Sequence, residues 1–243
     1  MEPWPYPLWI AHRGAGKLAP ENTLAAFKLG ASFGYRAFEC DVKLSSDEVP
    51  FLLHDAVLER TTSGKGAAGE RTWAELSQLD AGSWHSGAYR GEQLATLQGV
   101  ADFCIGAGCT INLEIKPTPG TELRTGQVVA RETAKLWAGH TPPLMSSFQV
   151  EALMGAAEGA AELPRALLLD ALRPGWLEQA RNLGCVAVVT HHPLMDEAAL
   201  GAIHGAGMKA LVYTVNDAAR AAWLIEHGID GLITDSVDKL KPA

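Results

Sequence analysis

Titratable and charged side chains follow short apolar runs at several places in the first half of the chain. They are His12 and Arg13 after "PLWIA", Glu39 and Asp41 within "AFECDV", His54 after "VPFLL", and Glu114 and Lys116 within "INLEIK". Carboxylates hold metal ions, an arginine binds an anion through two parallel hydrogen bonds, and an imidazole moves a proton near neutral pH. These residue types together predict chemistry on a small anionic substrate.

Three of the acids are spaced for a shared metal site. Glu39 and Asp41 are two residues apart, so on a strand both side chains point to one face and Cys40 points to the other. The same spacing relates Glu114 to Lys116. Three carboxylates on one wall repel each other unless a cation compensates, and an all-oxygen set suits one divalent cation, Mg²⁺ or Ca²⁺.

Each of these groups also has a plainer interpretation. A single pair of acids is typical of strand-end residues neutralised by Arg13 and Lys116, and an isolated histidine is typically a hydrogen-bonded core residue. Convergence of acids and cations from three consecutive strands, beside His12 and His54, favours a catalytic site. Two facing imidazoles with an ordinary pKa of about 6.5 supply a base and an acid together. The set meets the demands of phosphoryl transfer.

A repeating helix–strand unit must position these side chains. A glycine, which ends a helix, precedes several strand-prone segments, and amphipathic stretches such as "TLAAFKLGASF" stand between them. The strand-prone segments are "PLWIAH", "GYRAFECDV", "GCTINLEI", "PPLMSS", "PRALLL", "GCVAVVT", "GMKALVYTV" and "GIDGLIT". Eight such units in 243 residues predict a (β/α)8 TIM barrel, with a doubly wound open sheet as the alternative.

One stretch interrupts the repeat. Residues 48–96 contain "VPFLLHD", "RTTSGKGAAGERTW" and "GSWHSGAYRGEQ", which is too long for an ordinary loop of a barrel. We predict a single domain over 1–243, with a small, lid-like insertion at 48–96 after the second strand.

Polar residues at loop starts are open to more than one interpretation. Asn22 of "PENT" is the expected cap of the first helix, and Glu21 or Asn22 are possible neighbours of the site. Asn216 either binds substrate or a catalytic histidine, or caps a helix. Asp235 is expected to cap the last helix. The glycines of "HRGAG" let the backbone pass close to a ligand.

Composition excludes several classes of partner. A formal net charge of −8 disfavours nucleic acid and anionic membrane surfaces. The sequence shows no apolar run near the ~20 residues that cross a bilayer, and no basic segment at its start, so we predict a cytoplasmic protein without membrane insertion. The spacing of the four cysteines does not suit zinc, and they are expected to be small buried side chains. Composition does not decide whether the protein is a monomer or a homodimer.

The order of motifs resembles the glycerophosphodiester phosphodiesterase family. The motifs are "HRG", "PENT", "ExD", "HD", "RTTSGKG", "LDAGSW", "EIKP" and "YTVN", and they cover nearly the whole chain. The resemblance is strongest to short cytosolic bacterial members associated with glycerol-3-phosphate uptake, in glycerol and lipid metabolism. Two positions depart from the family pattern: Glu48 stands where a glycine is common, and Tyr213 where many members have tryptophan.

The resemblance implies a role for each residue of the constellation. His12 and His54 are implied as acid/base catalysts, Glu39, Asp41 and Glu114 as metal ligands, and Arg13 and Lys116 as phosphate contacts. By analogy with related barrel enzymes, the glycerol 2-hydroxyl attacks phosphorus with His12 as base and His54 as acid. Water then opens a cyclic phosphate with the roles reversed. Phe148, after the fourth repeating strand, is a candidate wall of the glycerol or alcohol pocket.

The leading hypothesis is metal-dependent hydrolysis of a small-molecule glycerophosphodiester to glycerol-3-phosphate and an alcohol. A lyase that stops at the cyclic phosphate is an alternative, which the three carboxylates disfavour. A non-catalytic phosphodiester-binding barrel is a second alternative, and the presence of both His12 and His54 counts against it. The sequence leaves open the head-group alcohol and the choice between Mg²⁺ and Ca²⁺.

Overall fold

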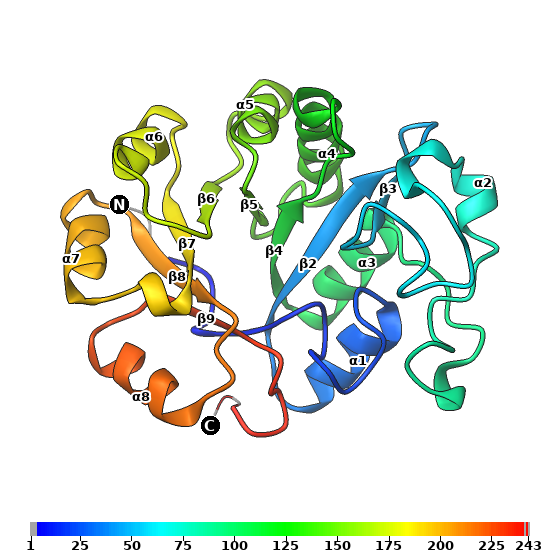
Figure 1. Ribbon diagram of the computed structural model, residues 1–243, viewed down its shortest axis with the longest axis horizontal. Helices are drawn as coiled ribbons and strands as arrows, with labels where there is room; N and C mark the ends of the chain where they lie inside the picture. Colours follow the sequence, from blue (N-terminus) through cyan, green and yellow to red (C-terminus); the bar gives the residue numbers. More distant parts are fainter. Residues whose placement is uncertain (1–3, 241, 243) are drawn as a thin grey trace.

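A closed cylinder of parallel strands forms the centre of the molecule (Figure 1). The computed structural model describes residues 4–240 and 242. In this part of the chain the parallel strands are β1 (Trp9–Ala11), β2 (Ala37–Leu44), β4 (Thr110–Ile115), β5 (Leu144–Ser147), β6 (Arg165–Leu169), β7 (Ala187–His191), β8 (Lys209–Tyr213) and β9 (Gly231–Thr234). Each overlaps one of the segments that the sequence predicts, and β2 and β7 extend past the predicted ends by two residues and one residue.

The first strand closes the barrel because it pairs on both sides. Ala11 of β1 lies opposite Phe38 of β2, and Trp9 of β1 lies opposite Leu232 of β9, both in parallel register. An open doubly wound sheet would leave two edges at this seam. The prediction of a (β/α)8 barrel is therefore confirmed.

Helices surround the strands in chain order (Figure 1). They are α1 (Leu24–Ser32), α3 (Leu97–Ala107), α4 (Glu122–Leu136), α5 (Val150–Gly159), α6 (Trp176–Asn182), α7 (Glu197–Gly205) and α8 (Ala218–Glu226), with a short 3₁₀ turn η3 (His192–Leu194) before α7. The predicted cap of the first helix is wrong by one residue. Thr23, not Asn22, accepts a hydrogen bond from the backbone N–H of Ala26 at 3.2 Å.

The interior of the barrel has an apolar side. One cluster joins inward side chains of strands that lie far apart in the sequence, which only the inside of a closed barrel brings together. Its strand members are Ile10, Ala37, Leu144, Ala166, Leu168, Ala187, Val189, Leu211 and Ile233. On β2 and β4 the buried residues Glu39, Asp41, Asn112 and Glu114 replace apolar ones, so the polar side of the interior is built by the first strands.

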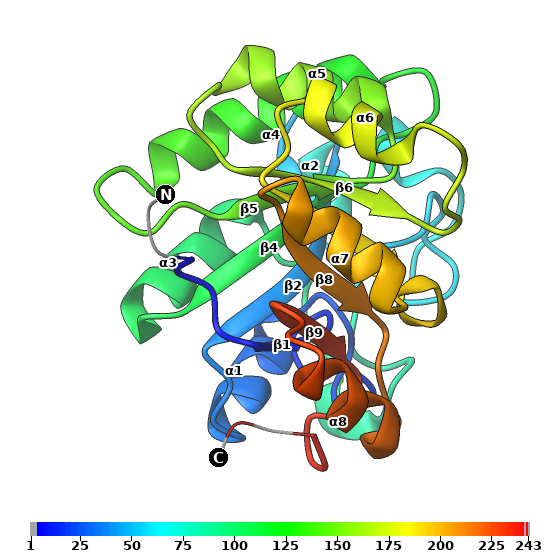
Figure 2. The ribbon, with the colours of Figure 1, turned by 90° about the vertical axis from the view of Figure 1, so that its left-hand side faces the viewer.

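Residues between β2 and α3 form the predicted insertion, which lies on the side of the barrel to which the arrowhead of β6 points (Figure 2). Its elements are β3 (Pro50–Leu52), η1 (Ala68–Glu70), α2 (Trp73–Leu76) and η2 (Gly87–Tyr89). It has a small apolar cluster of its own, which includes Phe51, Leu58 and Leu76. Its function as a lid stays a prediction.

All four cysteines are buried free thiols, as expected. Cys40 lies in the apolar cluster between β2 and the helices, so it points away from its neighbours Glu39 and Asp41, as the alternation predicts. Burial raises the pKa of the Cys40 thiol well above its ordinary value, and that of Cys185 to about 12. Among the described residues, no helix is both long enough and apolar enough to cross a membrane.

Candidate active site

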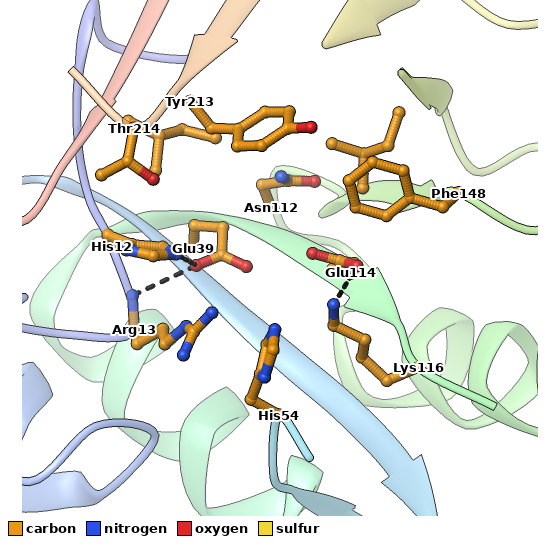
Figure 3. Close-up of a pocket in the computed structure, with 12 residues that line it drawn as sticks. His12, Arg13, Glu39, His54, Asn112, Glu114, Lys116, Phe148, Tyr213 and Thr214 are labelled. Carbon is orange, nitrogen blue, oxygen red and sulfur yellow. Dashed lines mark hydrogen bonds and ion pairs between the residues drawn. The ribbon is translucent and has the colours of Figure 1, made fainter. Parts of the chain in front are cut away.

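The carboxyl ends of the strands surround a cavity of about 230 Å³ (Figure 3). Seven of the nine predicted site residues line it, and Asp41 and Asn216 do not. The lining residues are His12, Arg13, Glu39, His54, Asn112, Glu114, Lys116, Phe148, Leu168, Tyr213, Thr214 and Ile233. The chemistry-bearing residues of the sequence analysis therefore meet at one mouth of the barrel, where active sites of this fold lie.

The three predicted metal ligands are gathered by strand register. Asp41 of β2 lies directly opposite Glu114 of β4, and Glu39 precedes Asp41 on the same face. One carboxylate oxygen from each residue lies within 4.8 Å of the others, and all three residues are buried. An all-oxygen set at this spacing fits a hard divalent cation such as Mg²⁺ or Ca²⁺.

The electrostatics of the three acids also favour a cation. Burial, followed by the charge of Asp41, raises the pKa of Glu39 well above its ordinary range and that of Glu114 to about 7. Burial alone would raise the pKa of Asp41 as well, but Arg13 and then Lys116 outweigh it and lower that pKa. A divalent cation would remove the repulsion that keeps protons on the two glutamates.

Two basic side chains border the acids. Arg13 binds Asp41 through Nε at 3.2 Å and Glu21 through Nη1 at 2.8 Å, and its backbone N–H donates to Glu39 at 3.1 Å. Lys116 Nζ lies 2.7 Å from Glu114 Oε1. Both cations thus face the cavity beside the acids, where they can bind a phosphate.

The loop after β1 adds a predicted neighbour. Asn22 has a left-handed backbone conformation, with φ of 60°, and its buried amide exchanges two hydrogen bonds with Asp41. The amide therefore fixes the carboxylate of a predicted metal ligand. This position explains why Asn22 is not the helix cap.

His12 is held by Asp235. The Nδ1 atom of His12 lies 2.6 Å from Asp235 Oδ1, and its Nε2 atom lies 3.8 Å from Glu39 Oε2. Burial would raise the pKa of Asp235, but the hydrogen bond with His12 helps to lower it to about 2. An ionised carboxylate only accepts, so His12 carries a proton on Nδ1 and its Nε2 faces the acids. The expected capping role of Asp235 is wrong, and no helix follows it in the described residues.

Gly16 allows the close approach that places Asp235 there. A Cβ atom at Gly16 would lie 2.1 Å from the carbonyl oxygen of Asp235, and its φ of +56° is unfavourable for other residues. Gly16 therefore brings the loop against the end of β9, and Gly14 brings it against Ala26 of α1.

Asn216 lies behind this pair. Its amide donates to Asp235 Oδ2 at 3.0 Å and accepts from the backbone N–H of Asp235 at 2.8 Å. It is not among the residues that line the cavity, and Asp217 caps α8 instead. The geometry favours support of a histidine through Asp235 over direct substrate contact or capping.

The antiparallel strand β3 places His54. It runs back along β2, with Leu52 opposite Val42, and the backbone N–H of Leu53 donates to the carbonyl of Asp41 at 3.1 Å. His54 therefore returns to the level of the acids, and its Nδ1 lies 2.7 Å from Asp55 Oδ1. Burial, and then Arg13 and Lys116, lower the pKa of His54, and Asp41 opposes this.

An aromatic wall faces the acids across the cavity. The rings of Phe148 and Tyr213 meet edge-on at 5.8 Å, and Lys116 Nζ lies 5.5 Å from the centre of the Phe148 ring. Phe148 thus lies where the sequence predicts it. Tyr213, one of the two departures from the family pattern, keeps an aromatic ring at this wall.

Sequence reasoning missed Asn112. This residue is only 4% exposed and lines the cavity, and neither polar atom of its amide has a hydrogen-bond partner within the described residues. The alternation of Asn112, Glu114 and Lys116 along β4 was the available signal. A buried amide without partners is costly, so a ligand or water in the cavity is expected to bind it.

Comparison with known proteins agrees with the arrangement of the site. The model of the glycerophosphoryl diester phosphodiesterase family matches residues 12–239. The chain belongs to this family. The Bacillus subtilis protein YhdW is 32% identical over 94% of each chain, and a glycerophosphodiester phosphodiesterase of Caldanaerobacter subterraneus is 30% identical over 96% of each. The family resemblance of the motifs is thereby confirmed.

Solved structures support the same assignment. A phosphodiesterase of Oleispira antarctica, in complex with its product sn-glycerol-3-phosphate, is 36% identical and superposes with a TM-score of 0.92, over 96% of this chain and 95% of that one. A glycerophosphodiester phosphodiesterase of Agrobacterium tumefaciens is 26% identical, with a TM-score of 0.82, over 95% and 97%. Members of the glycerophosphoryl diester phosphodiesterase family thus share both the fold and the overall length of this chain.

Proposed function

We propose that the chain hydrolyses glycerophosphodiesters to glycerol-3-phosphate and an alcohol. The observation that carries this proposal is the meeting of three buried carboxylates, two cations and two imidazoles around one cavity. Family membership supports the reaction class, and the Oleispira relative holds glycerol-3-phosphate as its product.

Arg13 and Lys116 would bind the non-bridging oxygens of the phosphate, which carry the negative charge. Glu39, Asp41 and Glu114 would hold one divalent cation, either Mg²⁺ or Ca²⁺. When bound, the cation supplies further neutralisation of phosphate charge and a template for the substrate. The unpartnered amide of Asn112 lies beside these acids and suits a hydroxyl of the glycerol moiety, because it offers both a donor and an acceptor.

The two histidines would move the protons. His12, with its Nδ1 proton held by Asp235, has Nε2 free to remove the proton of the glycerol 2-hydroxyl, whose oxygen then attacks phosphorus. His54 would protonate the departing alcohol. In the second step His54 takes a proton from water, the water oxygen opens the cyclic phosphate, and His12 returns a proton to the 2-hydroxyl. Phosphorus NMR would detect the cyclic phosphate.

The aromatic wall would accept the departing alcohol. Phe148 and Tyr213 face the acids from the apolar side of the barrel, so they are suited to the carbon atoms of the glycerol or of the alcohol. Asn216 would contribute through Asp235 rather than through the substrate. The insertion at 48–96, which carries His54, would act as a lid over this mouth of a single domain of 1–243.

Turnover of glycerophosphocholine tests the function. We expect release of glycerol-3-phosphate and choline with Mg²⁺ or Ca²⁺ present, and loss of activity with EDTA. His12→Ala and His54→Ala should each lower kcat at least about 1000-fold, within the range for loss of a proton-transfer group, with unchanged affinity for the cation. A double histidine variant that still turns over the diester would refute the assigned roles.

The lyase alternative predicts accumulation of the cyclic phosphate without glycerol-3-phosphate, and a binding protein predicts no turnover by the unmodified chain. Both alternatives are therefore outcomes of the same assay.

A further inference from the structure

Arg60, a residue of the insertion, binds two carboxylates through one guanidinium group. Its Nε and Nη2 atoms donate to the carboxylate of Asp55 at 2.6 and 2.9 Å. Its Nη1 and Nη2 atoms donate to the carboxylate of Glu21 at 2.9 and 2.8 Å. The planar fork of an arginine matches two carboxylates in this way, and a lysine ammonium does not.

Each of these carboxylates also holds a residue that lines the cavity. Asp55 accepts from Nδ1 of His54 at 2.7 Å, and Glu21 accepts from Nη1 of Arg13 at 2.8 Å. A continuous chain of five side chains therefore joins the histidine of the insertion to the arginine that follows β1. Arg60 is the middle member of this chain and does not line the cavity.

The carboxylate that Arg60 holds also determines which atom of His54 is free. The hydrogen bond from Arg60 is the largest of the influences that lower the pKa of Asp55. An ionised Asp55 only accepts, so the proton on Nδ1 of His54 stays between the two residues and Nε2 is left for the cavity. Among the described residues, the ring of His54 makes no hydrogen bond other than the one to Asp55.

The insertion has other connections to the barrel, but among the described residues none of them involves the carboxylate of Asp55. His85 lies 3.1 Å from the carbonyl oxygen of Lys17, and Glu92 accepts from the backbone N–H of Ala25. These connections hold the insertion against the loop after β1 and against α1 without touching the imidazole of His54. Arg60 alone among them reaches the carboxylate that orients this histidine.

We propose that Arg60 is a positioning residue, which fixes His54 relative to Arg13 so that the proton donor and the bound phosphate are aligned. The inference rests on the proposed function, because it assumes the acid/base role of His54. A displacement of about 1 Å in a reacting group is enough to slow a reaction about 100-fold, so the expected effect is on the chemical step.

Steady-state kinetics with glycerophosphocholine test this role. We expect Arg60→Ala to lower kcat about 30- to 100-fold with KM changed less than about threefold, since phosphate binding by Arg13 and Lys116 is retained. Arg60→Lys should stay at least tenfold below the unmodified chain, because one ammonium group cannot make the paired hydrogen bonds. Guanidinium chloride at low millimolar concentration should restore part of the kcat of Arg60→Ala, but none in His54→Ala.

Arg71→Ala is the matched control. Arg71 also lies in the insertion and pairs with an acid, Glu75, at 3.7 Å, but away from the cavity. It should leave kcat, KM and the melting temperature unchanged. If the unmodified chain and Arg71→Ala fail to turn over the diester, the proposed function is wrong. If they do turn it over and Arg60→Lys keeps more than half of their kcat, or if the loss in Arg60→Ala is confined to KM, the positioning role is overturned.

Discussion

The hydrogen bond between His12 and Asp235 joins the residues that follow the first and the last strand, at the end of the barrel that holds the cavity. It fixes the imidazole in the tautomer whose Nε2 faces Glu39. Asn216 in turn holds the other oxygen of Asp235. An acid also orients a histidine in unrelated hydrolases. When an amide replaces that acid, the geometry is retained but the histidine takes the wrong tautomer.

Asp235→Asn is expected to lower kcat about 100-fold or more, because an amide in place of the carboxylate can stabilise the wrong tautomer of His12. Cation binding, measured by calorimetry, should be unchanged, since Asp235 is not one of the three acids that share the site. Kinetics with glycerophosphocholine would measure the effect.

A second aspartate–histidine pair supplies the control. Asp230 binds His204 at 2.8 Å, away from the residues that line the cavity. Asp230→Asn should keep the kcat of the unmodified chain. Equal losses in both variants would mean that Asp235 acts through general stability rather than through His12.

Individual site residues were predictable from the sequence where they lie on a strand, because side chains alternate between its two faces. Glu39, Asp41 and Glu114 were found because alternation along one strand decides which side chains share a face. Asp235 and Arg60 were not assigned their roles, because their partners lie in the loop after β1 and in the insertion. Their contacts depend on three-dimensional proximity that no local period encodes.

At the scale of elements, α4 and α5 pack closely through two glycines. A Cβ atom at Gly155 of α5 would lie 2.0 Å from the carbonyl oxygen of Leu123, and one at Gly126 of α4 would lie 2.0 Å from that of Ala152. Backbone therefore contacts backbone at this interface, and both positions require the absence of a side chain.

Gly155→Ala is expected to lower the free energy of unfolding by about 1–3 kcal/mol, as in other overpacked interiors, because the helices must separate. Urea unfolding followed by circular dichroism would measure the change.

Gly201 of α7 is the matched helical glycine, with no atom within 4 Å of its Cβ position. Gly201→Ala should raise the free energy of unfolding by about 0.5–1 kcal/mol through helix propensity. If both substitutions shifted stability in the same direction, the close approach of α4 and α5 would not be the cause.

The strands were predictable because each is a short apolar run, which in five of the eight follows a glycine and in the other three a proline. The inner structure of 48–96 was not, since β3 is only three residues long and the rest consists of turns and helical segments of three or four residues. Glu48, one departure from the family pattern, keeps the left-handed conformation of the glycine it replaces, with φ of 62°. Its carboxylate binds Arg124 of α4, which connects the first turn of the insertion to the barrel.

At the scale of the whole molecule, the barrel has a charged half and an apolar half. The acids of β2 and β4 lie opposite the apolar interior of the later strands, so their charges are poorly solvated. Without a cation, the pKa values of Glu39 and Glu114 are higher in the folded protein than in the unfolded chain. At a pH between the two values, the folded protein therefore binds more protons.

The contribution of Glu39 and Glu114 to the stability of the cation-free protein is expected to fall as pH rises from about 5 to 8. Glu114 has a pKa of about 7 when folded against an ordinary 4.5, so between these values the folded state binds more protons and the free energy of unfolding decreases with pH. A divalent cation needs deprotonated carboxylates, so the rise in melting temperature that it causes should grow over the same range. Thermal melts in EDTA and in Mg²⁺ or Ca²⁺ would measure both trends.

Glu114→Gln should reduce the cation-induced rise in melting temperature at every pH, because it removes one of the three ligands. A cation effect of the same size at pH 5 and pH 8 in the unmodified chain would contradict the assignment of these acids as ligands.

The four buried thiols can report local unfolding, because a thiol reacts with a reagent only once it is exposed. A sulfhydryl reagent can label Cys40 only when β2 and the helices that cover it separate. Cys185 lies in the other half, in the cluster that lines β7 and β8. The rates at which Cys40 and Cys185 are labelled, measured by mass spectrometry, would therefore report the unfolding of each half separately. Because Cys40 stands between two carboxylates of the proposed metal site, cation binding should delay its labelling more than that of Cys185.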